Sequence, residues 1–230
     1  MLCDYVIHEL CQFFGANSSP ILSAHLTPYN ATGPAITPPI ESFKSVTSEP
    51  PSPPSKPIVL VGMMGAGKTS VGRKLAEFYG TTFIDADDEI VDAAGCSIED
   101  IFTVYGETAF RDVEERVITR ILGEAPCVLA TGGGAFMNDK VRAQIKEAAI
   151  SIWLKAELGV LIQRTSRRND RPLLRTGNPA EILRKLSTER NPVYATADII
   201  VETSNESLTE TLNKIITSLS EQTLADDGAH

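Results

Sequence analysis

The chain has 230 residues, 42% of them hydrophobic, and a formal net charge of −9. The length and hydrophobic fraction suit one α/β domain with extra segments, and the negative charge argues against general binding to nucleic acids or acidic membranes. No apolar run reaches the ~20 residues of a membrane-spanning helix. The spacing of the cysteines fits neither a zinc site nor a disulfide framework, so we expect reduced thiols in a cytoplasmic protein; they are Cys3, Cys11, Cys96 and Cys127.

Residues 1–56 differ in composition from the rest of the chain. They are rich in Pro, Ser and Thr and end in the tract PPSPPSK at 50–56. Such a tract cannot form a packed core, and the segment lacks the arginines of an organelle transit peptide. We therefore expect a disordered extension over 1–56, a folded domain over 57–220 and a flexible tail over 221–230.

Residues 62–69 read GMMGAGKT and fit the phosphate-binding pattern G-x-x-x-x-G-K-[ST]. The apolar run 58–61 precedes it as a strand, and a helical pattern over 68–79 follows. In such a loop, backbone N–H groups surround the phosphates, Lys68 supplies positive charge to the β- and γ-phosphates, and the Thr69 hydroxyl ligates Mg²⁺. The sequence therefore predicts binding of a nucleoside triphosphate.

The remaining chain alternates strand and helix patterns. Most of the predicted strands are short apolar runs, which is typical of a parallel sheet covered on both faces. Ligands in such a sheet bind beyond the carboxyl ends of its strands. The predicted strands are 58–61, 82–85, 127–131, 151–154 and 199–202. The predicted helices lie around 68–79, 98–121, 138–147, 157–166, 179–190 and 206–219.

Acidic residues follow the second predicted strand. Asp85 and Asp87 are expected near Thr69, where one carboxylate can support Mg²⁺ through water and the other can accept a hydrogen bond from an acceptor hydroxyl. The alternative is a solvated acidic turn that caps a helix beginning near Glu89. We favour that alternative for Asp88.

Two further patterns allow both a functional and a structural interpretation. Arg111 and Glu114 are three residues apart on a predicted helix, so they form either a surface ion pair or an arginine held to bind a substrate carboxylate. The third strand runs into three glycines at 132–134. Glycines there indicate that a ligand approaches the backbone, or simply a tight turn.

Five arginines lie between residues 164 and 175, with a single acid, Asp170, among them. Pro172 and Gly177 indicate a loop, and a basic loop beside a phosphate site is expected to act as a lid over the triphosphate. The alternative is a basic surface loop that binds RNA or anions in general. The arginines are Arg164, Arg167, Arg168, Arg171 and Arg175, and Arg190 follows near the end of a later helix.

Taken in order, these motifs resemble the shikimate kinases over about 57–220. The resemblance rests on GMMGAGKT, Asp85-x-Asp87, Phe110-Arg111-x-x-Glu114, Gly132-Gly133-Gly134, Arg171-Pro172-Leu173-Leu174 and Arg190-x-Pro192-x-Tyr194. It implies a P-loop kinase fold: α/β, three-layer αβα around a five-stranded parallel sheet, with a mobile lid at about 164–177. It also implies phosphorylation of the shikimate 3-hydroxyl by ATP, on the pathway to chorismate and the aromatic amino acids.

The resemblance also implies roles for individual residues. Thr69 binds Mg²⁺ with support from Asp85, and Asp87 orients or deprotonates the acceptor hydroxyl. Arg111 and Arg190 hold the shikimate carboxylate. The ATP phosphates are held by Gly65, Ala66, Gly67, Lys68, Thr69 and Ser70.

The remaining implied contacts concern the lid and the glycines. Arg171 closes over the phosphates and Arg164 packs near the adenine. Gly132, Gly133 and Gly134 contact shikimate. The expected assembly is a monomer with a small-molecule substrate and with neither a nucleic acid nor a membrane as partner.

Other functions remain open at this point. A different small-molecule kinase of the same fold, such as a gluconate or nucleotide kinase, shares the first motif. A GTPase would need an N-K-x-D base-reading motif, which is absent from the sequence. A non-catalytic nucleotide-binding module would be expected to lose Lys68, Asp87 or Arg171, and all three are present.

Overall fold

The computed structural model describes residues 55–166 and 178–227. Most of the N-terminal extension, the greater part of the predicted lid including Arg171, and residues 228–230 lie outside this part of the chain. The chain divides into two units, Met1–Pro50 and Pro51–His230, and every described residue belongs to the second.

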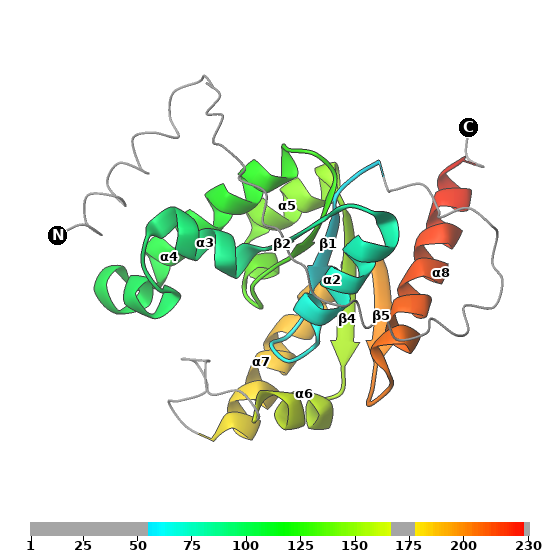
Figure 1. Ribbon diagram of the computed structural model, residues 1–230. Helices are drawn as coiled ribbons and strands as arrows, with labels where there is room; N and C mark the ends of the chain where they lie inside the picture. The colour runs from blue at the N-terminus through cyan, green and yellow to red at the C-terminus, as the bar shows by residue number, and fades with distance from the viewer. Residues whose placement is uncertain (1–54, 167–177, 228–230) are drawn as a thin grey trace, which may run out of the picture. The chain divides into compact units, whose positions relative to one another are not determined.

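Five parallel strands form one sheet in the order β2-β3-β1-β4-β5 (Figure 1). Every residue of β1 and β3 is buried, because these inner strands are covered on both faces. The predicted five-stranded parallel sheet is therefore confirmed. The strands are β1 (Ile58–Val61), β2 (Thr82–Asp85), β3 (Cys127–Ala130), β4 (Ile150–Ala156) and β5 (Ile199–Thr203).

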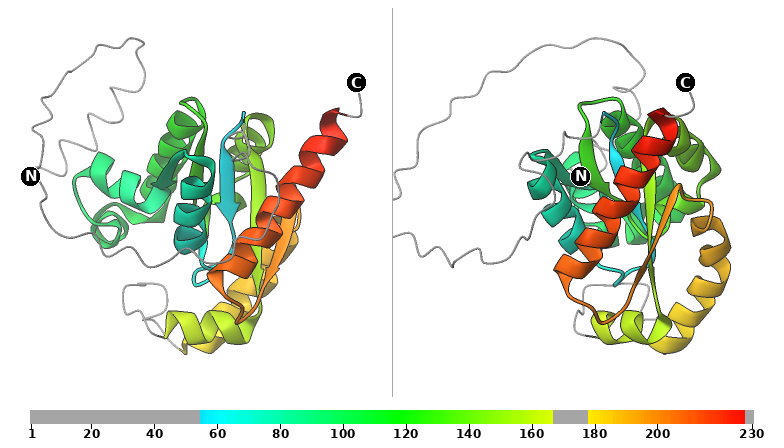
Figure 2. Two further views of the ribbon diagram at one scale, coloured as in Figure 1. Left: turned by 45° about the vertical axis from the view of Figure 1, so that its right-hand side comes forward. Right: turned by 90° about the vertical axis from the view of Figure 1, so that its right-hand side faces the viewer.

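Helices cover both faces of the sheet and complete the predicted three-layer arrangement. Helices α2 and α8 pack together on one face, while α4, α5 and α7 cover the other (Figure 2). None of the described helices is long and apolar enough to cross a membrane. The helices are α2 (Lys68–Tyr79), α3 (Ala86–Ala94), α4 (Ile98–Leu122), the 3₁₀ turn η1 (Ala135–Met137), α5 (Asp139–Ala148), α6 (Leu158–Thr165), α7 (Pro179–Tyr194) and α8 (Leu208–Asp227).

Two elements at the edge of the sheet differ from the predictions. Strand β5 alternates buried and exposed residues, with Ile200 46% exposed, because an edge strand here is covered on one face only. Helix α8 runs beyond the expected boundary at residue 220, to Asp227. The apolar composition of β5 predicted burial on both faces, but only one face is buried.

Two helices also differ from the helices predicted from the sequence. The predicted helix over 98–121 is interrupted at Gly106, whose φ of +82° and ψ of 174° are not helical. Glycine adopts this conformation without the steric penalty that a Cβ would bring. Helix α7 continues through Pro192 to Tyr194, although the sequence predicted an end at residue 190. This extra turn places Arg190 and Tyr194, four residues apart, on one face of the helix.

Candidate active site

The carboxyl ends of the strands open into one cleft of about 830 Å³. Its lining follows the order of the strands, because each connection after a strand contributes residues to it. Asp87 and Gly133 come from the connections after β2 and β3, and Lys68 comes from the connection after the central β1. Arg164 and Glu206 follow β4 and β5. The cleft therefore has an acidic and glycine-rich end, a phosphate loop in the middle and a second end beside β5.

The phosphate loop forms between β1 and α2, as predicted. Gly67 takes the position before α2 with φ of +98°, a left-handed conformation that favours glycine. The Lys68 ammonium donates hydrogen bonds to the carbonyl oxygens of Gly62, at 2.8 Å, and Met63, at 3.1 Å. The Lys68 ammonium thus folds back onto the phosphate loop, in the position where the loop would bind the phosphates of a nucleotide.

Asp85 joins the phosphate loop to α3. Its Oδ2 accepts a hydrogen bond from Thr69 Oγ1 at 2.9 Å, and its Oδ1 accepts one from the Asp87 backbone N–H at 3.2 Å. The second contact caps α3, so this helix begins at Ala86 and not near Glu89. Asp87 therefore lies in the first turn of α3. Asp88, expected to be a solvated capping residue, is exposed at the margin of the cleft and does not cap the helix.

Arg111 and Glu114 form an ion pair whose carboxylate is buried and whose arginine is partly exposed, so it is not a surface pair. Arg111 Nη1 donates to Glu114 Oε2 at 2.6 Å, and the Glu114 side chain is 2% exposed. Arg111 Nη2 also reaches the exposed Glu107 at 3.1 Å. Burial raises the pKa of Glu114, the nearby Arg111 opposes this shift, and the charge of Asp87 adds to it. The arginine is thus held in a fixed direction by a desolvated partner.

Two of the three glycines, Gly132 and Gly134, leave room for side chains of the site itself. A Cβ atom at Gly132 would lie 2.9 Å from Glu114 Oε1 and 3.0 Å from Asp87 Oδ1. A Cβ at Gly134 would lie 2.6 Å from both terminal nitrogens of Arg111. None of the three has a positive φ. The close neighbours of Gly132 and Gly134 are the protein's own charged groups, and the predicted contact of the glycines with a ligand stays a prediction.

Two side chains of α7 bond to Gly133, the middle one of the three glycines. The Gly133 carbonyl oxygen accepts hydrogen bonds from Arg190 Nη1, at 2.8 Å, and from the Tyr194 hydroxyl. Tyr194 is fully buried against Phe136 and Trp153, and burial raises its pKa to about 12. Its hydroxyl therefore keeps its proton at neutral pH and remains a donor. The sequence motif Arg190-x-Pro192-x-Tyr194 contains this tyrosine, but its hydrogen bond to Gly133 was not predicted.

Arg164 connects the two sides of the cleft beside β5. Its Nη2 donates to the Ser204 carbonyl oxygen at 2.8 Å, and its Nη1 approaches the carbonyl oxygens of Gly65 and Ala66 at 3.5 and 3.3 Å. The expected position near a nucleotide base is compatible with this placement. Arg171, which was predicted to close over the phosphates, lies outside the described residues.

The cleft also contains residues from the end of β5, the β5–α8 connection and the start of α8, and none of these was predicted from the sequence. The signal that could have indicated them is topological, since this connection follows the carboxyl end of the last strand. Their residue types carry no recognisable motif. They are Thr203 at the end of β5, Glu206 in the connection, and Leu208 and Thr211 in the first turn of α8.

Comparisons with known proteins agree with this geometry. Residues 64–220 match the family model described as shikimate kinase. A shikimate kinase of Caulobacter vibrioides (strain NA1000 / CB15N) is 52% identical over 165 residues, 72% of this chain and 82% of that protein. One of Brucella canis is 51% identical over 152 residues, 66% of this chain and 76% of that protein.

A solved structure gives the same result. The shikimate kinase from Acinetobacter baumannii in complex with shikimate superposes with a TM-score of 0.71 at 39% identity, covering 74% of this chain and 95% of that one. The matched family model spans most of the chain and includes the cleft residues on every strand connection. The chain belongs to the shikimate kinase family.

Proposed function

We propose that this chain transfers the γ-phosphoryl group of ATP to the 3-hydroxyl of shikimate, giving shikimate 3-phosphate and ADP. The observation that carries the proposal is the meeting of Arg111, Arg190 and Asp87 around the three glycines, next to the phosphate loop. Two arginines suit a carboxylate, and one aspartate suits a ring hydroxyl. Shikimate, an anionic polyol, offers both groups.

Lys68 and the phosphate loop position the ATP phosphates. When ATP binds, the ammonium is expected to exchange its contacts with the Gly62 and Met63 carbonyl oxygens for the β- and γ-phosphates. Phosphoryl transfer depends mainly on alignment and on neutralising the charge that spreads over the phosphate oxygens. A lysine that already lies inside the loop supplies that charge with little rearrangement.

Thr69 and Asp85 fit a Mg²⁺ ion. Their oxygens are 2.9 Å apart at the end of the phosphate loop, and oxygen donors of this kind are what Mg²⁺ takes in phosphoryl-transfer enzymes. Thr69 would ligate the ion directly and Asp85 would hold one of its waters. The ion, when bound, neutralises charge on the β- and γ-phosphates.

Asp87 is the group we assign to the acceptor hydroxyl. It can accept a hydrogen bond from the 3-hydroxyl and aim the oxygen at the γ-phosphate. Arg111 and Arg190 hold the carboxylate of the same molecule, and Gly132, Gly133 and Gly134 allow the ring to lie close to the backbone. Arg171 is proposed to close over the phosphates and Arg164 to border the adenosine.

The acceptor is tested by ADP release from the full chain with shikimate, gluconate or a nucleoside monophosphate. We expect saturable ADP formation with shikimate and only background rates with the others. Gluconate turnover at a comparable kcat/KM would instead support a gluconate kinase of the same fold. Tight ATP binding without turnover of any acceptor would support a non-catalytic module.

Glu114→Gln should raise the KM for shikimate about tenfold and leave the KM for ATP nearly unchanged, because Arg111 loses its charged buried partner. The matched control is Glu107→Gln, which removes the exposed partner of the same arginine and should change little. Steady-state kinetics with each substrate varied in turn measure both effects. Equal KM values for shikimate in the two variants would contradict the assignment of Glu114.

We further propose that residues 57–220 are the catalytic unit, acting as a cytoplasmic monomer without nucleic-acid or membrane partners. Deletion of residues 1–52 should then leave kcat, both KM values and the melting temperature within experimental error. Parallel kinetics and calorimetry on the full and shortened chains make the comparison. A fall in kcat or melting temperature would instead show that the extension contacts the catalytic unit.

A further inference from the structure

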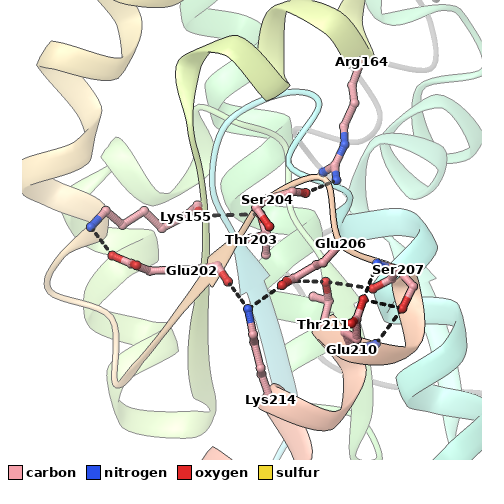
Figure 3. Close-up of polar contacts among 10 residues, drawn as sticks. All are labelled: Lys155, Arg164, Glu202, Thr203, Ser204, Glu206, Ser207, Glu210, Thr211 and Lys214. Atoms are coloured by element: carbon pink, nitrogen blue, oxygen red, sulfur yellow. Dashed lines mark hydrogen bonds and ion pairs between the residues drawn. The ribbon is translucent and has the colours of Figure 1, made fainter.

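The connection between β5 and α8, residues 204–207, is fastened by a cluster of side chains around Glu206 (Figure 3). Glu206 Oε1 accepts a hydrogen bond from Thr211 Oγ1 at 2.9 Å, and its Oε2 accepts one from Lys214 Nζ at 2.5 Å. The same ammonium donates to the Glu202 carbonyl oxygen at 3.1 Å. One lysine of α8 thus ties the end of β5 to the middle of the connection.

Other contacts fix both ends of the same connection. Arg164 donates to the Ser204 carbonyl oxygen and approaches the phosphate-loop carbonyls, so the start of the connection is held relative to that loop. At the other end, Ser207 and Glu210 bond to each other's backbone N–H groups and cap α8. Glu206 lies between these two anchors, and the bonds from Thr211 and Lys214 restrain its side chain.

Glu206 also differs from ordinary surface carboxylates in its position. Its side chain is 13% exposed and it lines the cleft together with Thr211. The hydrogen bond from Lys214 lowers the pKa of Glu206, so it is ionised at neutral pH. A nearby pair offers a direct comparison: Lys155 and Glu202 are 2.7 Å apart but 45% and 76% exposed, and neither lines the cleft.

The end of the cleft beside this connection is the one left for a nucleoside. The phosphate loop follows the central strand β1. The groups assigned to the acceptor gather at the β2 and β3 end: Asp87 follows β2, and Arg190 reaches from α7 to Gly133 in the connection after β3. A triphosphate bound in the loop must therefore direct its nucleoside toward the connections after β4 and β5. The residues of the 204–207 connection then border the base and ribose.

We propose that Glu206 and Lys214 are positioning residues for the nucleotide: with Thr211 they form a latch that holds the 204–207 connection in its nucleotide-binding shape. The inference rests on the proposed function only in taking ATP as the phosphoryl donor. A connection already ordered before binding avoids the free-energy cost of ordering it when the nucleotide arrives. The latch lies at the end of the cleft beside β5 and is expected to act on nucleotide affinity.

The test is calorimetric titration of the full chain with ADP and, separately, with shikimate. Glu206→Gln and Lys214→Met should each raise the Kd for ADP about fivefold, the scale of ordering a few side chains. The Kd for shikimate should stay unchanged, and Lys214→Arg should restore most of the ADP affinity. The control variants Lys155→Met and Glu202→Gln, which break the neighbouring exposed pair, should bind ADP like the unmodified chain.

The double variant Glu206→Gln/Lys214→Met should bind ADP no more weakly than either single variant, because both changes release the same contact. The latch is refuted if its variants bind ADP like the control variants, or if they lose ADP and shikimate affinity to the same extent. The ADP titration contains no acceptor, so it is independent of the proposed reaction. A chain that binds ADP normally but does not phosphorylate shikimate would refute the proposed function, while the latch would still be judged by the ADP affinity of its variants relative to the control variants.

Discussion

Lys68→Ala should lower kcat by roughly 10²- to 10³-fold, the usual loss when one preorganised donor to developing charge is removed. The reason is positional, since Lys68 opens α2 and its ammonium lies inside the phosphate loop. The variant also loses two hydrogen bonds to the Gly62 and Met63 carbonyl oxygens. We therefore expect a decrease of about 1–2 kcal/mol in the free energy of unfolding, which a domain of this size tolerates.

The control for Lys68 is Lys74→Ala in the same helix. Lys74 is 53% exposed and pairs with Glu77, so its loss should leave turnover unchanged. Steady-state kinetics at saturating shikimate, with melting curves for both variants, separate the loss of charge from the loss of structure. Near-normal turnover in a folded Lys68→Ala variant would show that this loop does not position the transferred phosphoryl group.

Asp87→Asn should lower kcat roughly 10²-fold or more, the scale expected for a positioned acid–base group. Asparagine keeps the size of the side chain but loses its charge and its capacity to take a proton. The KM for ATP should change little, because the phosphate loop remains intact. The structure adds a reason for the position of Asp87: it lies in the first turn of α3, fixed through its backbone N–H by Asp85.

Asp92→Asn is the matched control for Asp87, since Asp92 lies on the same helix, is exposed and does not line the cleft. Its kinetic constants should equal those of the unmodified chain. The comparison is made with shikimate varied at saturating ATP. If Asp87→Asn kept full kcat, the acceptor hydroxyl would have to be oriented by another group, and the assignment of this end of the cleft would be wrong.

Two kinds of feature were predictable from the sequence: those that one contiguous segment determines by itself, and those that follow from the parallel arrangement of neighbouring strands. The phosphate loop is one, because its glycines, its lysine and the flanking strand and helix are contiguous. The positions of Asp85 and Thr69 are another, because parallel strands bring their carboxyl ends to one edge of a sheet. Both were predicted, and the 2.9 Å contact between their side chains agrees with that expectation.

Features that depend on distant contacts were not predictable from local patterns. The spacing of Arg111 and Glu114 is the same for a surface pair as for a buried one, and only packing against Gly132 and Gly134 distinguishes them. Pro192 suggests a helix end, yet α7 continues to Tyr194. That turn bonds through Arg190 and Tyr194 to Gly133, far away in the sequence.

The connection after β5 shows the same limit. Glu206, Thr211 and Lys214 form no known motif, and their contact becomes visible only when β5 and α8 are placed together. Their sequence spacing would be equally ordinary on a solvated surface. The cleft was therefore predictable on the side of β1, β2 and β3 and was not predictable on the side of β5.

The central claim is that the chain moves a phosphoryl group from ATP to one hydroxyl of shikimate. The most direct test is ¹H–³¹P correlation spectroscopy of the product formed by the full chain with ATP, Mg²⁺ and shikimate. We expect a single phosphorus signal coupled to the proton at carbon 3, formed in equal amount with ADP and greatly reduced with Asp87→Asn. Phosphorus found only as inorganic phosphate, or coupled to another ring proton, would contradict it.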